Sequence, residues 1–377
     1  MLSSRLAVPG ASKPNVTVSP VTRPSTPVYP PGRTPAPAAL VDDQRYAYGT
    51  FDGPLPVVNP LEVAGRNPVR RALRNLRLKE WEAFQLGNDE WFVLGAVYDT
   101  KSLGLLQLLA VNKEAATISR WETKLPSPLI HVARGLDGTR SAGRFRDLSI
   151  SIVNEISAGA LTVDVDHPGS ATKPSLHLHG VGRCMPGDAG HLVICHPFDT
   201  NEDDRALYSH KAMMPFQGRM TIGAEIVELD AERSFMILDD HHGDYPSPMR
   251  YDWITGIRRA PESGRVEGFN LTRNQIRDPH VFNENAIWLG SEVHRLPPVT
   301  FERRKGPWGP WRARDTTGAV DVTFTPTVRS AMHVGPKRFL AEYYAPYGWF
   351  EGTIEAEHAT LVVDGFFGVG EQKMIRV

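Results

Sequence analysis

The sequence predicts an all-β protein built from two sheets or two barrels. Short segments in which apolar and polar residues alternate recur along most of the chain, which is the periodicity of half-buried strands. The 33 glycines and 31 prolines punctuate these segments, while helical periodicity is confined to a few short stretches. A length of 377 residues exceeds that of the usual single domain. These observations together favour two antiparallel β domains.

Three regions are expected along the chain. Residues 1–60 form a proline-rich arm, because the stretch from Pro9 to Pro37 is rich in proline, serine and threonine and has no apolar periodicity. Such an arm is extended or disordered, and acts either as a plain tail or as a docking segment. Residues 61–232 form the first β domain and residues 233–377 the second, with the boundary near residues 231–234.

A short helix is predicted after the arm. Asn67 followed by Pro68 is typical of a helix cap and first position, and Val69, Leu73 and Leu76 recur on one helical face. This segment is the most basic of the chain, and contains Arg66, Arg70, Arg71, Arg74, Arg77 and Lys79. It could contact RNA or a lipid headgroup, but no aromatic platform is interleaved, so we favour a solvated charged face.

The remaining chain is predicted to form strands joined by turns. Expected strands cover Trp81–Leu86, Trp91–Tyr98, Leu105–Val111, Leu148–Ile152, Leu161–Val165, Leu176–His179, His191–Ile194, Met220–Leu229, Phe235–Leu238, Val320–Phe324, Phe339–Tyr344 and Ala359–Val363. Local turns such as Asn88-Asp89 between them indicate an antiparallel meander.

Composition narrows the classes of partner. The formal net charge of -1 gives no long-range attraction for nucleic acid, and we expect no nucleic-acid partner. No apolar run approaches the roughly 18–20 residues of a transmembrane helix, and the start lacks an apolar signal core. Two cysteines exclude a disulfide framework and fit a reducing compartment. We therefore expect a soluble, cytoplasmic protein that is a monomer or a homodimer.

Several well-known catalytic motifs are missing from the sequence. It contains no G-x-S-x-G elbow, no H-E-x-x-H and no Walker glycine loop, and Gly368-Val369-Gly370 is more typical of a turn than of a dinucleotide site. Hydride transfer, phosphoryl transfer and serine hydrolysis therefore lose support. No cofactor is expected.

Histidines gather in the middle of the chain and raise the question of a metal. The group consists of His177, His179, His191, Cys195, His196, His210, His241 and His242. His177 and His179 share one strand face and could chelate a metal, or they could pair with the neighbouring Asp164 and Asp166. A spaced ligand set is missing, so we expect no metal.

The stretch from Ser234 to His294 carries the strongest functional signal. The apolar strand Phe235–Leu238 runs directly into Asp239, Asp240, His241 and His242, and ionisable groups after a core strand are costly unless paired or used. Strand alternation sends Asp239 and Asp240 to opposite faces, so one of them points inward. A carboxyl against apolar walls has a raised pKa and can act as a general acid.

A structural reading of the same stretch stays open. Residues 239–250 can be a loop ordered by Asp and Arg pairing and by its prolines. Asn270, Asn283 and Asn285 can cap turns, and Trp253 can belong to a core or to a cavity wall. The candidate ligand-binding residues are Lys211, Arg250, Tyr251, Trp253, Asn270, Asn283, Asn285 and His294.

Several segments resemble a bacterial family known only as a domain of unknown function. They are Arg77–Trp81, Ser209–Lys211, Asp240–Gly243 through Tyr251–Trp253, Gly268–Leu271, Asn283–Asn285 and Gly365–Glu371. That family is itself similar to the AttH and carotenoid hydratase (hydroxyneurosporene synthase) group of lipocalin-like proteins. The resemblance covers residues 60 to 377 and implies two lipocalin-like barrels or half-barrels with a ligand cavity, without a redox cofactor. It also favours Asp240 as the catalytic aspartate.

Two hypotheses for function follow. In the first, a cofactor-independent hydratase, isomerase or cyclase acts on a lipophilic, isoprenoid- or polyketide-like substrate in a barrel cavity. Asp240 is the general acid, His241 or His242 relays the proton, and Asp239 is the second candidate carboxyl. In the second, the protein is a non-enzymatic carrier of a lipid or metabolite. A weaker third possibility is an interaction module that acts through the proline-rich arm.

Overall fold

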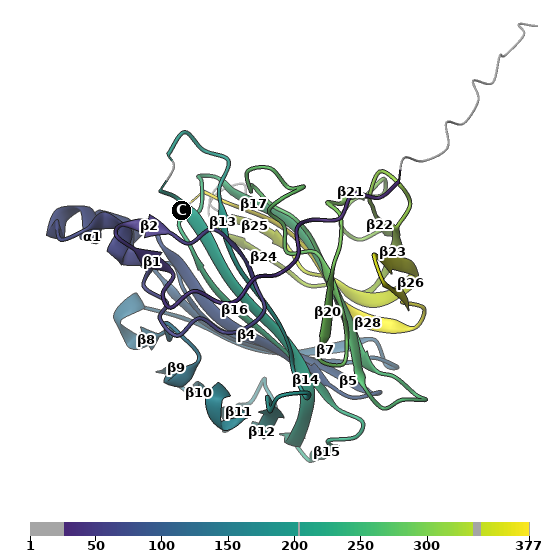
Figure 1. Cartoon of the computed structure of the whole chain (residues 1–377). Helices are drawn as coiled ribbons and strands as arrows, with labels where there is room; N and C mark the ends of the chain where they lie inside the picture. Colours follow the sequence, from purple (N-terminus) through teal and green to yellow (C-terminus); the bar gives the residue numbers. More distant parts are fainter. Residues whose placement is uncertain (1–25, 203, 335–340, 377) are drawn as a thin grey trace, which may run out of the picture.

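The computed structural model describes residues 26–202, 204–334 and 341–376, and within them the chain is almost entirely β (Figure 1). The first sheet contains β3 (Gly49–Phe51), β4 (Lys79–Gly87), β5 (Trp91–Asp99), β6 (Gly104–Asn112), β7 (Thr117–Leu125), β8 (Ile130–His131), β9 (Asp137–Phe145), β10 (Leu148–Glu155), β11 (Ala160–His167), β12 (Leu176–Arg183), β13 (Gly190–Pro197), β14 (Ala206–Ile222), β15 (Glu225–Leu229) and β16 (Phe235–Gly243). The second contains β17 (Met249–Arg259), β18 (Val266–Arg273), β19 (Ala286–Leu289), β20 (Glu292–Arg295), β21 (Thr300–Glu302), β22 (Trp311–Arg314), β23 (Val320–Val328), β24 (Ala331–Val334), β25 (Ala341–Tyr344), β26 (Tyr347–Ala356), β27 (Ala359–Val362) and β28 (Phe366–Ile375). The prediction of an all-β protein with two antiparallel barrel-like sheets is confirmed.

The first sheet curls until it nearly closes into a barrel, and the second forms a half-barrel. The long strand β14 makes the bend: its first part pairs with β16, and its last residues pair with β12. At the other end of the sheet, β8 and β9 approach β5. Phe84, Trp121 and Phe216 fill the interior of this barrel, while Trp311 and Phe324 fill that of the second sheet.

A third apolar core lies between the two sheets. It joins the outer face of the first sheet, with Phe92 and Ile237, to Trp288, Tyr347 and Phe367 of the second. The indole of Trp288 also donates a 2.9 Å hydrogen bond to the carbonyl of Gly190. The two sheets are therefore packed face to face rather than joined by a free linker.

Strand β16 belongs to the first sheet, although we expected a second domain to begin at residue 233. It lies between β4 and β14 and pairs with both along its whole length, from Phe235 to Gly243. The chain passes to the second sheet only between Gly243 and Met249. The hydrogen-bonded pairing with β4 and β14 places this strand in the first sheet. A local pattern of apolar residues followed by polar ones does not indicate which strands it pairs with.

The predicted helix is present as α1 (Pro68–Arg77), and Asn67 caps it by accepting hydrogen bonds from the backbone N–H groups of Val69 and Arg70. Arg74 and Arg77 contact the carboxylate of the buried Asp244 at 3.1 and 2.8 Å, which ties the helix to the end of β16. Shorter 3-10 helices cover Pro60–Ala64 (η1), Ser127–Leu129 (η2) and Ile156–Ala158 (η3). Among the described residues, no helix is long and apolar enough to cross a membrane.

The N-terminal segment from residue 26 to 59 lies across both sheets, as the dark purple trace in Figure 1 shows. Arg33 donates to the carbonyl of His191 in the first sheet, and Arg295 of the second sheet donates to the carbonyl of Pro31. Further along, β3 pairs with β13, and β1 (Val41–Asp42) pairs with β2 (Arg45–Tyr46). The part of the predicted arm from residue 26 onward is thus folded onto the protein, whereas residues 1–25 lie outside the described residues.

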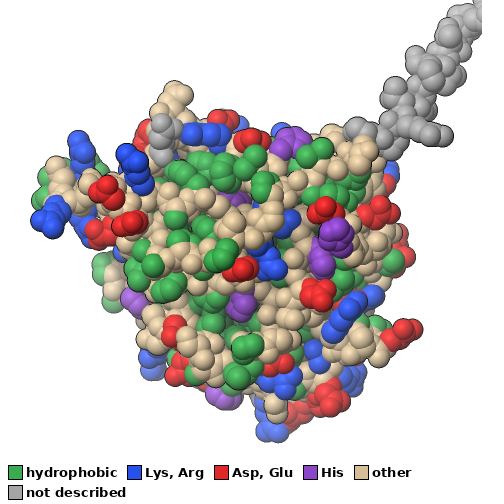
Figure 2. All heavy atoms as spheres, viewed as in Figure 1, with side chains coloured by type: hydrophobic (Ala, Val, Ile, Leu, Met, Phe, Trp, Pro, Cys, Tyr) green, Lys and Arg blue, Asp and Glu red, His purple; other side chains and the backbone are tan. Residues whose placement is uncertain are grey.

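The face in Figure 2 carries positive and negative side chains that are intermixed rather than separated. This agrees with the nearly balanced charge of the chain. The arginines of α1 stand at one edge of this face, next to acidic side chains. Two of these pairs are Arg71 with Glu62, and Arg77 with Glu202. Such pairing limits the local field that the helix offers to an anionic partner.

Candidate functional site

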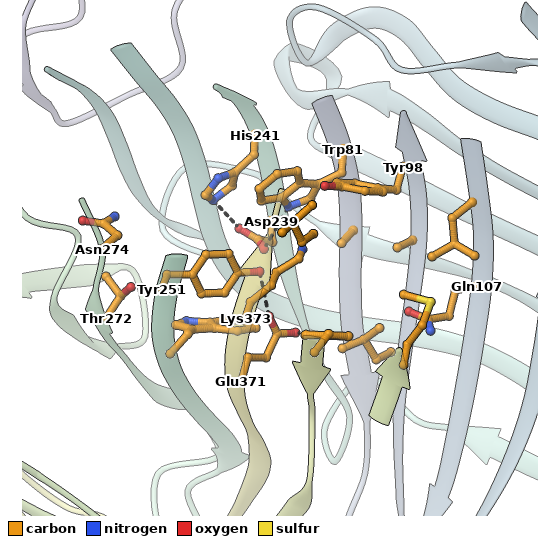
Figure 3. A pocket seen from close by; sticks show the side chains of 18 of the residues that line it. Trp81, Tyr98, Gln107, Asp239, His241, Tyr251, Thr272, Asn274, Glu371 and Lys373 are labelled. Carbon is orange, nitrogen blue, oxygen red and sulfur yellow. Dashed lines mark hydrogen bonds and ion pairs between the residues drawn. The ribbon is translucent and has the colours of Figure 1, made fainter. Parts of the chain in front are cut away.

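A cavity of about 120 Å³ lies between the two sheets, outside both barrel interiors (Figure 3). Its first wall comes from β4, β5, β6, β14 and β16, and its second from β17, β18, β25 and β28. The polar and aromatic lining residues are Trp81, Gln85, Tyr98, Gln107, Lys211, Asp239, His241, Tyr245, Tyr251, Trp253, Thr272, Asn274, Glu284, Tyr343, Glu371 and Lys373. Aromatic walls with a few converging polar groups are typical of a ligand site.

Asp239 is the carboxylate of the first wall, and it is fully engaged. It accepts a hydrogen bond from the ammonium of Lys211, which lies directly opposite on β14. The Nε2 atom of His241 lies 3.0 Å from Asp239 Oδ1, and the indole of Trp81 donates to the other oxygen at 3.5 Å. The ring of His241 stacks on that of Trp81, with centroids 4.4 Å apart. Asp239 is therefore held in one orientation.

These contacts keep Asp239 and Lys211 charged. Burial alone would raise the pKa of Asp239, but Lys211 and His241 outweigh it and hold that pKa well below the ordinary 3.8. Burial alone would lower the pKa of Lys211, but Asp239 and Glu284 outweigh it and raise that pKa. The expected raised pKa of an inward aspartate is therefore not found at Asp239, because Lys211 neutralises it.

Glu371 is the carboxylate of the second wall, and its surroundings are different. It accepts a 2.9 Å hydrogen bond from the phenol of Tyr251 and a second hydrogen bond from the phenol of Tyr343. Burial raises its pKa above the ordinary 4.5, against the opposing effects of Lys373 and of the two tyrosines. Glu371 thus has the property that the sequence led us to expect of an aspartate: a buried carboxyl that retains its proton more readily than in water.

Lys373 lies two residues further along β28, on the same face as Glu371. Its Nζ atom lies 5.0–5.3 Å from the ring centroids of Trp81, Tyr98, Tyr251 and Tyr343. Burial lowers its pKa, while the carboxylates of Glu371 and Asp239 oppose that effect. Figure 3 shows this amine between the carboxylates of Asp239 and Glu371.

Asp240 does not line the cavity, although the resemblance favoured it. As strand alternation predicted, it points to the opposite face of β16 from Asp239, into the interior of the first barrel. There its neighbour His242 contacts both Asp240, at 3.2 Å, and Glu80, at 2.9 Å. Burial lowers the pKa of His242, but these two carboxylates outweigh it and raise that pKa to about 9. The barrel interior therefore contains a second polar cluster, separate from the cavity.

The other predicted binding residues divide between cavity and scaffold. Lys211, Tyr251 and Trp253 line the cavity. Asn270 instead accepts a 2.5 Å hydrogen bond from the Trp253 indole and donates to the carbonyl of Glu284, so it orients a wall residue.

Asn283 and Asn285 lie outside the cavity lining. Asn283 donates to the carbonyl of Leu296, and Asn285 donates to the carbonyl of Pro297 and accepts from the backbone N–H of Thr272 on β18. His294 contacts Glu292 on β20, at 3.4 Å. Both asparagines, which we expected to bind ligand, therefore order the backbone and do not line the cavity.

Arg250 lines an open groove of about 500 Å³ that borders the cavity. Tyr251, Asn274 and Lys373 belong to the walls of both hollows. The groove also contains Arg273 and the ion pair of Arg303 with Asp252, whose nearest atoms are 2.6 Å apart. Bulk solvent therefore reaches the protein directly beside the cavity.

The histidines of the middle region are distributed over several surroundings. His177 and His179 face Asp166 and Asp164 at 3.5 and 2.6 Å, so the predicted pairing with neighbouring aspartates is confirmed. His191 and His210 contact each other at 2.9 Å. In the described part of the chain, no three His, Cys, Asp or Glu side chains form a group that could hold a metal.

Sequence reasoning missed Glu371, Lys373, Tyr343 and Glu284 as cavity residues. One signal was available: Glu371 and Lys373 are charged residues two apart in the final strand, which places both on one face. That face reaches Asp239 only because the two sheets pack against each other. No local sequence pattern predicts that contact between the sheets.

Comparison with known proteins identifies the family of this chain. The chain is similar to the solved structures of an AttH protein from Nitrosomonas europaea (TM-score 0.49, 11% identity, 80% of this chain and 94% of that chain) and of CghA with Sch210972 (0.45, 9%, 80% and 88%). It is also similar to kievitone hydratase from Nectria haematococca (0.42, 14%, 79% and 88%). No curated protein matches it in sequence. The resemblance to a domain of unknown function is confirmed, and the chain belongs to the family described as Domain of unknown function (DUF2804), whose profile matches residues 40–376.

Proposed function

We propose that this protein binds a lipophilic small molecule between its two sheets and acts on it by cofactor-independent acid/base chemistry, of the hydratase, isomerase or cyclase type. The observation that carries the proposal is the buried carboxyl of Glu371, whose raised pKa sets it apart from the ionised Asp239 on the facing wall. Pairs of groups whose surroundings push their pKa values in opposite directions are typical of acid/base sites.

In this mechanism Glu371 takes the role that the sequence suggested for Asp240. Its proton passes to an alkene carbon or a carbonyl oxygen of the substrate, and positive charge develops on the substrate. The faces of Trp81, Tyr98 and Tyr251 attract that charge. The carboxylate of Glu371 then accepts a proton from a neighbouring carbon, which isomerises the substrate, or from an attacking water, which hydrates it.

The size of the cavity bears on the substrate. About 120 Å³ is less than the roughly 300–1,000 Å³ of pockets that enclose a drug-sized ligand. We infer that the cavity holds the reacting part of an isoprenoid- or polyketide-like molecule, and that the bordering groove receives the rest. The apolar walls favour an unsaturated or aromatic reacting part.

Deuterium incorporation tests the proposal across a range of possible substrates. The purified protein is incubated in D2O with a panel of unsaturated terpenoids and enones, and the recovered molecules are weighed by mass spectrometry. At least one should gain deuterium with wild-type protein and not with Glu371→Gln. Equal incorporation with both proteins would contradict the role of Glu371.

A carrier function is the second candidate, because aromatic walls can hold an apolar ligand without any proton transfer. Native mass spectrometry of the purified protein would then detect a bound lipophilic molecule that Glu371→Gln retains. No member of the panel would gain deuterium from the solvent.

A further inference from the structure

Lys373 differs from Lys211, the other amine of the same cavity. Among the described residues, Lys373 Nζ has no hydrogen bond or ion pair, and its neighbours are the faces of four aromatic rings. Lys211 donates to Asp239 and lies 3.6 Å from Glu284. One amine is fixed as an ammonium by two carboxylates, whereas the other has all its donor positions available.

We propose that Lys373 is a nucleophile that attacks a carbonyl carbon of the bound substrate and joins it as an iminium ion. The substrate class is then an aldehyde or a ketone with an apolar body. This inference rests on the proposed function, since it concerns the same cavity, and it assigns covalent catalysis to a residue beside the proton donor Glu371.

The step is balanced without any further reagent. The nitrogen lone pair forms a bond to the carbonyl carbon, and the C=O π electrons move to oxygen. That oxygen takes a proton from the nitrogen, which thereby regains its lone pair. A second proton, from Glu371, lets the hydroxyl leave as water while the nitrogen lone pair closes the C=N bond. One carbonyl, one neutral amine and one proton from Glu371 give one iminium ion, one water and the Glu371 carboxylate, so no oxidant or reductant takes part.

The ring cage suits both the amine and its product. The iminium carries its positive charge at the position that the Lys373 ammonium occupied, so the faces of Trp81, Tyr98, Tyr251 and Tyr343 stabilise it as well. An iminium also acidifies the neighbouring C–H bond. The Glu371 carboxylate, two residues away on the same strand face, can then move that proton, which links the covalent step to isomerisation.

The protonation of the two amines agrees with this assignment. Burial lowers the pKa of Lys373, despite the opposing carboxylates of Glu371 and Asp239. The pKa of Lys211 is raised, because its carboxylate partners outweigh its burial. Only a neutral amine attacks a carbonyl, so Lys373 is the more reactive of the two.

Reductive trapping tests the proposal on the wild-type protein. The full chain is treated with benzaldehyde and sodium cyanoborohydride, and each lysine is then followed by peptide mass spectrometry. Lys373 should gain a benzyl group about tenfold faster than Lys211. Lys113 is the matched control: burial lowers its pKa to about 8, but it lies outside the cavity and donates to the carbonyl of Asn88. A rate at Lys373 that does not exceed those of both other lysines would overturn the proposal.

Lys373→Arg keeps a cation in the ring cage but cannot form an imine. With this variant, both the benzyl adduct at position 373 and deuterium incorporation into carbonyl substrates should be lost. If deuterium incorporation is unchanged, the covalent role fails and the acid/base function stands. Another outcome is that wild-type protein forms the benzyl adduct at Lys373 while no panel member gains deuterium. That result would support Lys373 as a nucleophile and contradict the proposed acid/base function.

Discussion

The two walls of the cavity shift the pKa of a buried carboxyl in opposite directions. On the first wall, Asp239 faces the ammonium of Lys211 across a strand pair and is held ionised. On the second, Glu371 receives hydrogen bonds from two neutral phenols, and burial raises its pKa. The difference shows that burial alone does not make a proton donor: the partners that share the buried space decide the protonation state.

The largest expected effect is on stability, from Asp239→Asn. This change leaves the buried Lys211 ammonium without its main counter-charge, and loss of one partner of a buried pair costs about 3–5 kcal/mol. Urea unfolding of both proteins should show this loss as a lower midpoint. The double variant Asp239→Leu/Lys211→Met removes both charges and should recover most of the stability, whereas no recovery would mean that the ion pair is not the cause.

The next effect is on turnover, from Glu371→Gln. Loss of a positioned general acid costs about 100-fold or more in rate. The fold should be unchanged, because the amide oxygen of glutamine can still accept from one of the two phenols while its NH2 group donates to the oxygen of the other. Deuterium incorporation into a reactive panel member measures the rate. Glu351→Gln is the matched control, since it changes an exposed glutamate on β26 that lines neither the cavity nor the groove, and it should retain the wild-type rate.

A pH titration compares the two walls directly. Carboxyl carbon NMR should show Glu371 titrating above 4.5 and Asp239 below 3.8. The stability contributions have opposite signs. Protonated Glu371 stabilises the fold below pH 4.5, and this contribution is lost as the pH rises through its raised pKa. Ionised Asp239 stabilises the fold above pH 3.8, and this contribution is lost as the pH falls through its lowered pKa. Two carboxyls that titrate together would remove the distinction between the walls.

The smallest expected effect on the cavity comes from Asp240→Asn, the neighbour of Asp239 on the opposite strand face. Binding of a lipophilic ligand, followed by quenching of the wall tryptophans, should change by less than about twofold, because no atom of Asp240 lines the cavity. A large loss of binding in a variant that remains folded would place Asp240 in the site after all.

The sequence predicted the strand content and the division of side chains along β16, for identifiable reasons. Alternation along Phe235–Leu238 correctly divided Asp239 from Asp240, because a strand fixes which residues share a face. It did not show which face was the cavity, since both faces of β16 are buried, one inside the barrel and one against the second sheet. The expectation of a site inside a barrel overlooked this second buried face.

Apart from Tyr251 and Trp253 of β17, the second wall was beyond local reasoning. Glu371 and Asp239 face the same cavity from two different sheets. The sequence predicts the single strands of these sheets but not how the sheets pack. The low pKa of Asp239 depends on the register that sets Lys211 opposite to it, and a shift of that register by one residue would move Lys211 to the other face. Pairing and packing between distant segments decide the chemistry of this site.

The N-terminal segment that crosses both sheets limits the ways in which a ligand can reach the cavity. Arg33 binds the carbonyl of His191 on one sheet, while Pro31 accepts from Arg295 and the phenol of Tyr29 donates to the carbonyl of Glu355 on the other. The segment thus acts as a tether along one edge of the interface and resists separation of the sheets there. A ligand would then enter and leave through the groove beside Tyr251 and Asn274, without separation of the two sheets.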